Sequence, residues 1–295
     1  EQENIDLSGI KVVYADKTLT NAYDYKKYNC IPLKNNPISE MKSVKTAKEI
    51  SEYKKTFKLA DKALLMTRQY IEDNDFVSEF DIAKNLEENF YKTGALGLSF
   101  KSIVAKDQNS ALAHYSKNSK HEILKDGSLV LSDCGAYYSS GLATDATRVF
   151  VKGNPTEKQK EIYTKVLKAF LKAFSYKVKE STSGYLIDKS ARTLLNSIKP
   201  DGFSFGHGLG HGIGISVHEA PPNLSPSKFA KHKLEPNMCF TIEPGLYNPH
   251  EFGVRLENSC YLDKNYVIQS FSNMPFEKKL INFNMLTPSE KKKLA

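Results

Sequence analysis

The residues most able to do chemistry in this chain are four carboxylates and one imidazole, which stand in separate short motifs. They are Asp133, Asp145, His211, Glu243 and Glu257. Carboxylates can bridge two metal ions, and an oxygen-rich donor set with one histidine favours manganese or cobalt over structural zinc. Two metals that share one hydroxide can hydrolyse an amide. The five residues together therefore indicate a metal-dependent hydrolase.

The two aspartates belong to one motif, DCGAYYSSGLATDATR. Strand-like residues 127–137 and 143–151 flank the turn SSGL, which predicts a β-hairpin. Because side chains alternate along a strand, Asp133 continues a row of apolar side chains, and a buried carboxylate needs a partner or a metal. A structural explanation stays open, in which one aspartate caps the turn and the other pairs with Arg148.

Each glutamate follows an apolar strand signal. Glu243 stands in CFTIEPGLY, where Pro-Gly ends the strand, and Glu257 stands in GVRLENSCYL. Arg255 shares a strand face with Glu257, because the two are two residues apart, so they could form a structural ion pair. Any one motif admits such an explanation, but the combination of motifs is far more specific for a metal site.

Three of the seven histidines lie in the glycine-rich segment GHGLGHGIGISVHE: His207, His211 and His218. Glycine allows tight turns and close approach to a ligand, and so much glycine argues against a zinc-binding helix. One metal ligand with two hydrogen-bonding imidazoles is the better division of roles.

Composition narrows the classes of function. The formal net charge is +8, but only four of the 42 basic residues are arginine, and the lysines are interleaved with glutamate. A solvated surface explains this charge better than nucleic-acid binding does. The four cysteines have no CxxC spacing, and no stretch reaches transmembrane length. We therefore expect a cytoplasmic protein with no nucleic-acid or membrane partner.

Two helix pairs, each followed by a group of strands, recur along the chain. The helices are expected at 42–71, 79–92, 156–179 and 183–197, with Thr156 as an N-cap. Further strands are expected at 98–105, 213–218, 238–243 and 253–262. This order predicts an α+β domain of two similar halves, in which helices cover one face of a curved antiparallel sheet.

The first residues differ from the rest. Residues 12–28 could hold a strand and a short helix, and the following IPLKNNPIS is typical of a linker. We therefore interpret 1–38 as the remnant of a preceding domain plus a linker, and 39–295 as the catalytic domain.

The order and context of the five residues resemble those of the pita-bread metallopeptidases, which include methionine aminopeptidase, prolidase and aminopeptidase P. The matching motifs are DCGA…DATR, HGLGHGIG…VHEAP, IEPGLY and GVRLE, and the resemblance covers about residues 40–285. The chain looks most similar to aminopeptidase P of the three-domain cytosolic type. His114 in AHY, the pair His207 and His218, and a C-terminal extension from about 275 support this assignment.

The resemblance implies a pita-bread fold and a site for two divalent metal ions, manganese above all, with zinc or cobalt as alternatives. It implies that Asp133 chelates one metal and His211 the other, that Asp145 and Glu257 bridge both, and that Glu243 binds on the His211 side. One departure is the spacing of Asp133 and Asp145, which is twelve instead of the usual eleven. An extra residue at the hairpin tip, or a bulge, would absorb it.

The implied activity is removal of the N-terminal residue from peptides with proline at the second position, by attack of a metal-bridging hydroxide on the Xaa-Pro amide. Glu243 would then also shuttle the proton to the leaving nitrogen. His218 and His114 would stabilise the oxyanion. His207 would line the proline pocket, and Arg255 would orient the carboxylate ligands.

Two alternatives stay open. A prolidase, which cleaves Xaa-Pro dipeptides, would need a cation for the free carboxylate of the substrate, and the sequence identifies none. A non-catalytic peptide-binding module on the same fold would be expected to lose ligands, and all five are present. Methionine aminopeptidase and creatinase fit less well. A homodimer is expected from the resemblance alone.

Overall fold

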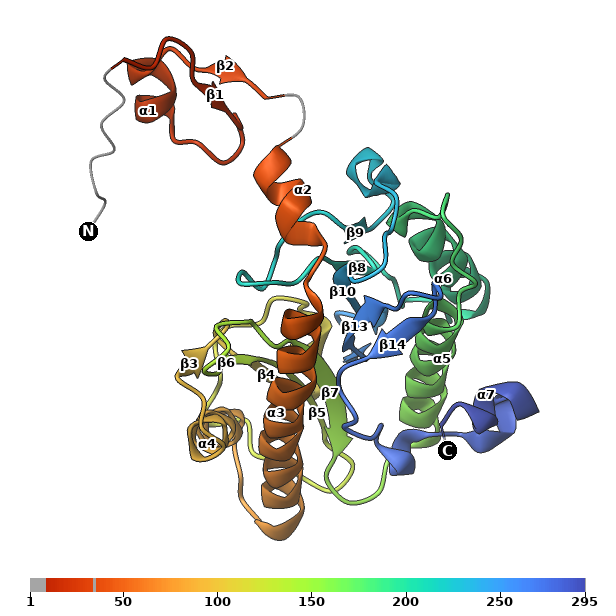
Figure 1. Cartoon of the computed structure of the whole chain (residues 1–295). Helices are drawn as coiled ribbons and strands as arrows, with labels where there is room; N and C mark the ends of the chain where they lie inside the picture. The colour runs from red at the N-terminus through yellow and green to blue at the C-terminus, as the bar shows by residue number, and fades with distance from the viewer. Residues whose placement is uncertain (1–8, 34–35, 295) are drawn as a thin grey trace. The chain divides into compact units, whose positions relative to one another are not determined.

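The computed structural model describes residues 9–33 and 36–294, and the chain divides between Lys42 and Ser43 into two compact units (Figure 1). In the first unit, β1 (Tyr14–Ala15) pairs in parallel with β2 (Ile31–Pro32), and α1 (Ala22–Lys27) connects them. The expected strand and short helix are present. The expected linker, however, contains β2 and the start of α2 (Pro37–Ser43). The domain boundary at residue 38 stays a prediction.

The larger unit is built from two halves of similar order, each a helix pair followed by strands. The first half contains α3 (Ala47–Asp73), α4 (Glu79–Lys92), β3 (Gly97–Leu98), β4 (Ile103–Lys106), η1 (Asp107–Ala111), β5 (Leu129–Cys134), β6 (Ala136–Tyr137) and β7 (Ala146–Val151). The second half contains α5 (Glu157–Phe174), α6 (Gly184–Ile198), β8 (Gly210–His211), β9 (Asn223–Leu224), η2 (Lys228–Lys231), β10 (Cys239–Ile242), β11 (Gly245–Tyr247), β12 (Gly253–Arg255), β13 (Asn258–Leu262) and β14 (Ile268–Ser270). The tail adds η3 (Lys278–Leu280), η4 (Phe283–Met285) and α7 (Pro288–Lys292).

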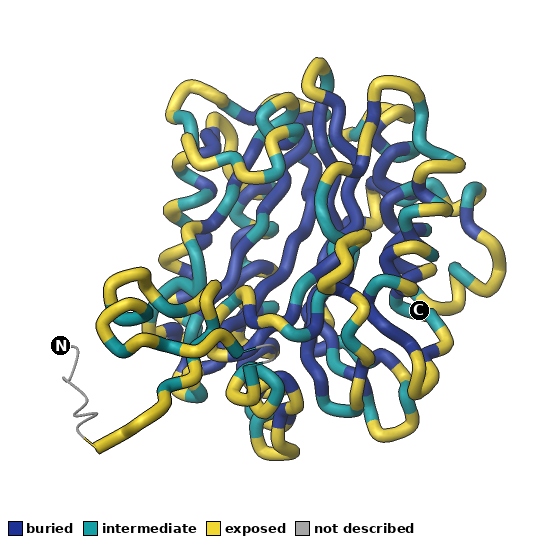
Figure 2. Tube along the Cα trace, turned by 90° about the horizontal axis from the view of Figure 1, so that it is seen from above, coloured by how far each residue is buried: buried dark blue, intermediate teal, exposed yellow. Residues whose placement is uncertain are grey.

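Each half contributes an antiparallel three-stranded sheet, with strand orders β4-β5-β7 and β10-β13-β14. Figure 2 shows buried strands running through the middle of this unit and exposed segments around them. The helices bury regularly spaced apolar side chains against the sheets, as Ile82, Leu86 and Phe90 of α4 show at four-residue intervals. The strands therefore form a rigid centre on which polar side chains at strand ends can be held.

The predicted hairpin is confirmed, and its pairing explains the extra residue between the two aspartates. The register does not shift between the pairs Cys134↔Ala146 and Tyr137↔Ala143, which are three residues apart on both strands. No bulge intervenes, so the additional residue lies in the hairpin tip. Gly135 is required within the paired region, because a Cβ there would lie 1.8 Å from the carbonyl oxygen of Thr144.

Several predicted elements need correction at their ends. The helix expected at 42–71 begins at Ala47, because Thr46 and Glu49 form a capping box. For the helix expected at 156–179, the predicted N-cap Thr156 is confirmed, but the helix ends at Phe174. The prediction for 183–197 is confirmed within one residue by α6, and that for 79–92 is confirmed by α4.

Two predicted strands are interrupted and one is wrong. Residues 98–105 separate into β3 and β4, and residues 253–262 break at Leu256–Glu257 between β12 and β13. Residues 213–218 form bends instead of a strand. Their backbone is held by other elements, since Gly214 O accepts hydrogen bonds from the Tyr53 hydroxyl (3.1 Å) and from Ala143 N–H (2.9 Å).

Lys152 stabilises the end of the longest helix, α3. Its ammonium group donates to the carbonyl oxygens of Ile71 (3.1 Å), Glu72 (2.9 Å) and Asn74 (2.9 Å), which α3 itself leaves unpaired. We expect Lys152→Met to lower the free energy of unfolding by about 2 kcal/mol in chemical denaturation. The matched variant Lys160→Met, which removes only a surface pair with Glu157, should cost under about 0.5 kcal/mol. Equal losses would contradict the capping role.

Candidate active site

One cavity of about 610 Å³ collects every site residue that the sequence predicted. Those residues are Asp133, Asp145, His114, His207, His211, His218, Glu243, Arg255 and Glu257. They come from both halves of the larger unit and extend along the chain from His114 to Glu257. The two halves therefore have to pack together before the site exists.

The first half supplies the aspartates from its hairpin. Asp133 lies near the end of β5, paired with Ile103 of β4 and Thr147 of β7. Asp145 immediately precedes β7, and its carbonyl oxygen accepts a hydrogen bond from the Ser259 hydroxyl (2.8 Å) of the other half. Paired strands on both sides of β5 leave these carboxylates little freedom to move.

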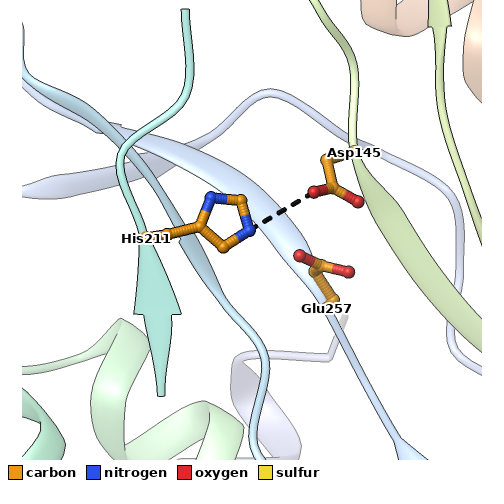
Figure 3. A group of neighbouring side chains, drawn as sticks. All are labelled: Asp145, His211 and Glu257. Atoms are coloured by element: carbon orange, nitrogen blue, oxygen red, sulfur yellow. Dashed lines mark ion pairs between the residues drawn. The ribbon is translucent and has the colours of Figure 1, made fainter. Parts of the chain in front are cut away.

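The second half supplies the remaining donors from strand ends. His211 lies in β8, Glu243 directly follows β10, and Glu257 lies in the break between β12 and β13. Donor atoms of Asp145, His211 and Glu257 all lie within 4.8 Å of one another (Figure 3). His211 Nε2 is 3.4 Å from Asp145 Oδ2 and 3.5 Å from Glu243 Oε1. Asp133 and Glu243 line the same cavity just outside this tight group.

Glycine on both sides of His211 permits this close packing. A Cβ at Gly210 would lie 2.0 Å from the carbonyl oxygen of Thr241, and one at Gly212 would lie 2.1 Å from that of Glu219. Gly212 O also lies 3.0 Å from His211 Nδ1. Since a carbonyl oxygen can only accept, Nδ1 carries the proton, which leaves the lone pair on Nε2 directed at the carboxylates.

The donor set fits a cation. Asp133 Oδ1, Asp145 Oδ1 and Glu257 Oε1 are buried and have no hydrogen-bond partner among the described residues. A buried anionic oxygen without a partner is costly, and a divalent ion would satisfy all three. Oxygen donors from four carboxylates with one imidazole suit two adjacent divalent metals, as the sequence predicted.

Burial and mutual repulsion perturb these carboxyl groups. Burial raises the pKa of Asp145 and that of Glu257 well above their usual values, and neighbouring carboxylates raise them further. Burial also raises the pKa of Glu243, against the opposing effects of His211 and Arg255. The protein alone therefore disfavours the charged form of the cluster, and bound cations would reverse this preference.

Arg255 is the cation of the protein that faces this cluster. Its buried guanidinium donates to Asp133 Oδ2 (2.5 Å), to the Tyr247 hydroxyl (2.9 Å) and to Thr147 Oγ1 (3.3 Å). Thr147 in turn donates to Glu257 Oε2 (2.7 Å). The alternative pair of Arg255 with Glu257 is therefore wrong, because Arg255 reaches Glu257 only through Thr147.

Arg148 does not pair with either aspartate, so that alternative is also wrong. Its fully buried guanidinium donates instead to the backbone oxygens of Thr147 (2.9 Å), Glu257 (2.6 Å) and Met274 (2.5 Å). Arg148 thereby fixes the position of the Glu257 backbone.

The cavity contains three histidines besides His211, and they lie in different environments. Burial lowers the pKa of His207 to about 3, so its ring is neutral, with Nε2 2.8 Å from the Tyr247 hydroxyl. The ring of His218 meets that of His211 edge-on, with centroids 4.2 Å apart. His114 is exposed at the cavity and has no hydrogen bond to any described residue.

Sequence reasoning assigned no role to Tyr247, which connects His207 to Arg255 and so to Asp133. The feature of the sequence that could have identified Tyr247 was its position as the last residue of the motif IEPGLY. Thr147 was also missed, although it stands inside the DATR motif.

Residues 51–264 match metallopeptidase family M24. This chain belongs to metallopeptidase family M24. Among curated members, it is 33% identical over 288 residues to Xaa-Pro aminopeptidase 1 of Dictyostelium discoideum, with 89% of this chain and 45% of that protein covered. It is 35% identical over 249 residues to the Xaa-Pro dipeptidase of Pyrococcus horikoshii, with 84% and 66% covered. This chain thus spans about half the length of the Dictyostelium protein and about two thirds of the Pyrococcus protein.

A solved X-Pro aminopeptidase from Thermotoga maritima is similar in structure, with a TM-score of 0.75 and 32% identity over 85% of this chain and 69% of that one. The α+β pita-bread fold predicted for the M24 chain is thereby confirmed. No described helix is both long enough and apolar enough to cross a membrane.

Proposed function

We propose that this chain is the catalytic domain of a dinuclear metallo-aminopeptidase that removes the residue preceding a proline. The observation that carries the proposal is the meeting of five metal-type donors with three further histidines in one cavity. Asp133, Asp145, His211, Glu243 and Glu257 would hold two divalent ions, for which manganese is the first choice. These ions would supply a hydroxide at neutral pH and polarise the substrate carbonyl.

Glu243 has two oxygens with different neighbours, which supports a double role. Oε1 lies 3.5 Å from the metal-type nitrogen of His211, whereas Oε2 lies 3.9 Å from His207 Nδ1. Oε2 is therefore the atom that would pass a proton to the prolyl nitrogen of the leaving group.

The environment of His207 suits a proline ring. The imidazole is neutral because burial lowers its pKa to about 3, and its ring packs edge-on against Phe205 with centroids 4.9 Å apart. A prolyl nitrogen in a peptide bond has no N–H to donate, so an uncharged, shaped surface recognises it better than an acceptor would. His218 and His114 would face the substrate carbonyl oxygen as hydrogen-bond donors.

Tripeptide hydrolysis tests the proposal most directly. The purified chain, loaded with Mn²⁺, should release the first residue from Gly-Pro-Ala, and metal analysis should find two ions per chain. Removing the metal with a chelator should abolish release, and Mn²⁺ should restore it. Bound metal without turnover of any peptide would favour the non-catalytic module, and absence of metal binding would refute the hydrolase.

Prolidase activity is a second candidate, supported by the similarity to Xaa-Pro dipeptidases. It needs a cation for the carboxylate of a dipeptide. Lys101 is an exposed cation that lines the cavity and donates to Ser116 O (3.0 Å), whereas Arg255 is engaged with the Asp133 carboxylate. If dipeptides are the substrates, Lys101→Met should raise their KM about tenfold with little change in kcat. Under the aminopeptidase proposal, the same variant should leave the KM of amidated Gly-Pro-Ala unchanged.

The proposal also includes a homodimer and a cytoplasmic location, both from the resemblance. Sedimentation velocity of the purified chain would test the dimer, and fractionation of the source cells would test the location.

A further inference from the structure

Glu79 is a fully buried carboxylate outside the metal-type cluster. It occupies the first turn of α4, and none of its side chain is exposed. No lysine, arginine or histidine of the described residues lies within ion-pair distance of it. A buried charge without a cation needs several hydrogen-bond donors, so its partners show what it holds in place.

Four donors use both oxygens of Glu79. Oε1 accepts from Lys106 N–H (2.6 Å) and from the Asn109 amide (2.9 Å). Oε2 accepts from Ser119 N–H (2.9 Å) and from the Tyr115 hydroxyl (2.8 Å). The proton of Tyr115 is shared with the carbonyl oxygen of Lys117, which is 2.5 Å away.

These partners flank His114 on both sides in the sequence. Two precede it and two follow it, so one carboxylate closes the segment 106–119 into a loop. After η1, this loop has no helix or strand, yet its residues 113–116 line the cavity. The exposed ring of His114 has no hydrogen bond of its own to described residues, so its position depends on the backbone of this loop.

We propose that Glu79 is the positioning residue that directs His114 into the active-site cavity. The other contacts of the loop, such as those of Ser110 with Gly253 and of Asn118 with Val104 O (3.0 Å), each hold one point of it. Within the loop, the Asn109 amide also donates to the Tyr115 hydroxyl (3.1 Å), and Tyr115 N–H donates to Leu112 O (3.0 Å). Among the described hydrogen bonds, Glu79 is the one side chain from outside the loop that binds both the part before His114 and the part after it. The kinetic consequence rests on the proposed function, whereas the ordering of the loop does not.

Glu79→Gln tests this role with little change in shape. Glutamine offers one acceptor oxygen and one N–H₂ group, so two of the four donors lose their acceptor. We expect hydrogen–deuterium exchange of residues 106–119 to rise at least tenfold. The control Asp81→Asn disturbs the capping box of the same helix but not the loop, and it should leave this exchange unchanged. Asn109→Ala, which removes one donor outside the cavity, should show a smaller increase.

Kinetics then show whether the loop acts through His114. Glu79→Gln should lower kcat/KM for Gly-Pro-Ala roughly 10- to 100-fold with two metals still bound. In a His114→Ala background it should have less than a threefold further effect. The inference would be overturned if the losses of kcat/KM from Glu79→Gln and His114→Ala multiplied in the double variant. It would also be overturned if hydrogen–deuterium exchange of residues 106–119 did not change in Glu79→Gln. A wild-type chain without Xaa-Pro hydrolysis would refute the proposed function instead, and the exchange experiment would still decide whether Glu79 orders the loop.

Discussion

Asp145→Asn is expected to abolish metal-dependent peptidase activity and yet to stabilise the metal-free protein at pH 8. Loss of activity should reach about 10³-fold or more, because the several kcal/mol that bound metals contribute to the transition state would be lost. The stabilisation has a separate cause. Asp145 is buried beside other carboxylates, and its pKa is raised well above the usual value by burial and by the charges of Asp133 and Glu243.

The sign of the pH effect follows from this direction. The folded metal-free chain holds protons on Asp145 and Glu257 at pH values where the unfolded chain has released them. The contribution of these two carboxyl groups to stability is therefore full below their pKa values in the unfolded chain, and it declines as the pH rises through their raised pKa values in the folded state. Asparagine at position 145 removes one charge from the cluster and should flatten this decline.

Thermal unfolding of the chelator-treated protein measures this effect. At pH 8 the variant should melt at least about 2–4 °C above the wild type, which corresponds to roughly 1 kcal/mol in a domain of this size. The exposed Asp201→Asn should not change the melting temperature. Saturating Mn²⁺ should raise the melting temperature of the wild type but not that of Asp145→Asn. A metal-free variant less stable than the wild type at pH 8 would show that Asp145 has a favourable partner in the fold.

Arg255→Met is expected to be the most damaging substitution among residues that do not bind metal. Its guanidinium is the charged partner of Asp133 and also donates to Tyr247 and Thr147. Methionine leaves Asp133, whose side chain is only 14% exposed, beside other carboxylates without that partner. This should lower the stability of the metal-free chain by about 3–5 kcal/mol. Affinity for Mn²⁺ should fall roughly 10- to 100-fold, because the orientation of the ligand carboxylates is lost.

Arg68→Met is the matched control for Arg255→Met. Arg68 pairs with the buried carboxylate of Glu277 away from the cavity, with Nε and Oε2 2.9 Å apart. Its loss should lower the unfolding free energy but leave the Mn²⁺ affinity measured by calorimetry unchanged. If both variants lose stability and neither loses metal affinity, Arg255 has no part in orienting the ligands.

The sequence alone was enough to predict the fold class and the candidate donors. Helix periodicity and capping residues are local signals, so α4 and the hairpin of β5 and β7 were predicted closely. The motif residues were recognisable because each combines a chemically able side chain with a strand end or a glycine turn.

Only the tertiary structure decided which charges pair and which loops are ordered. The sequence left open an ion pair of Arg255 with Glu257 on one strand, but the folded chain brings Arg255 to Asp133, which is 122 residues away. Residues 213–218 alternate like a strand, yet Tyr53 and Ala143 hold them as bends. Glu79 looks like an ordinary residue of a helix start, and its role depends on a loop that reaches it across the fold. Local sequence patterns specify helices and strands. The partner of a buried charge depends instead on which distant segments come together when the chain packs. Only burial makes an unpaired charge costly, so the need for that partner arises in the folded protein.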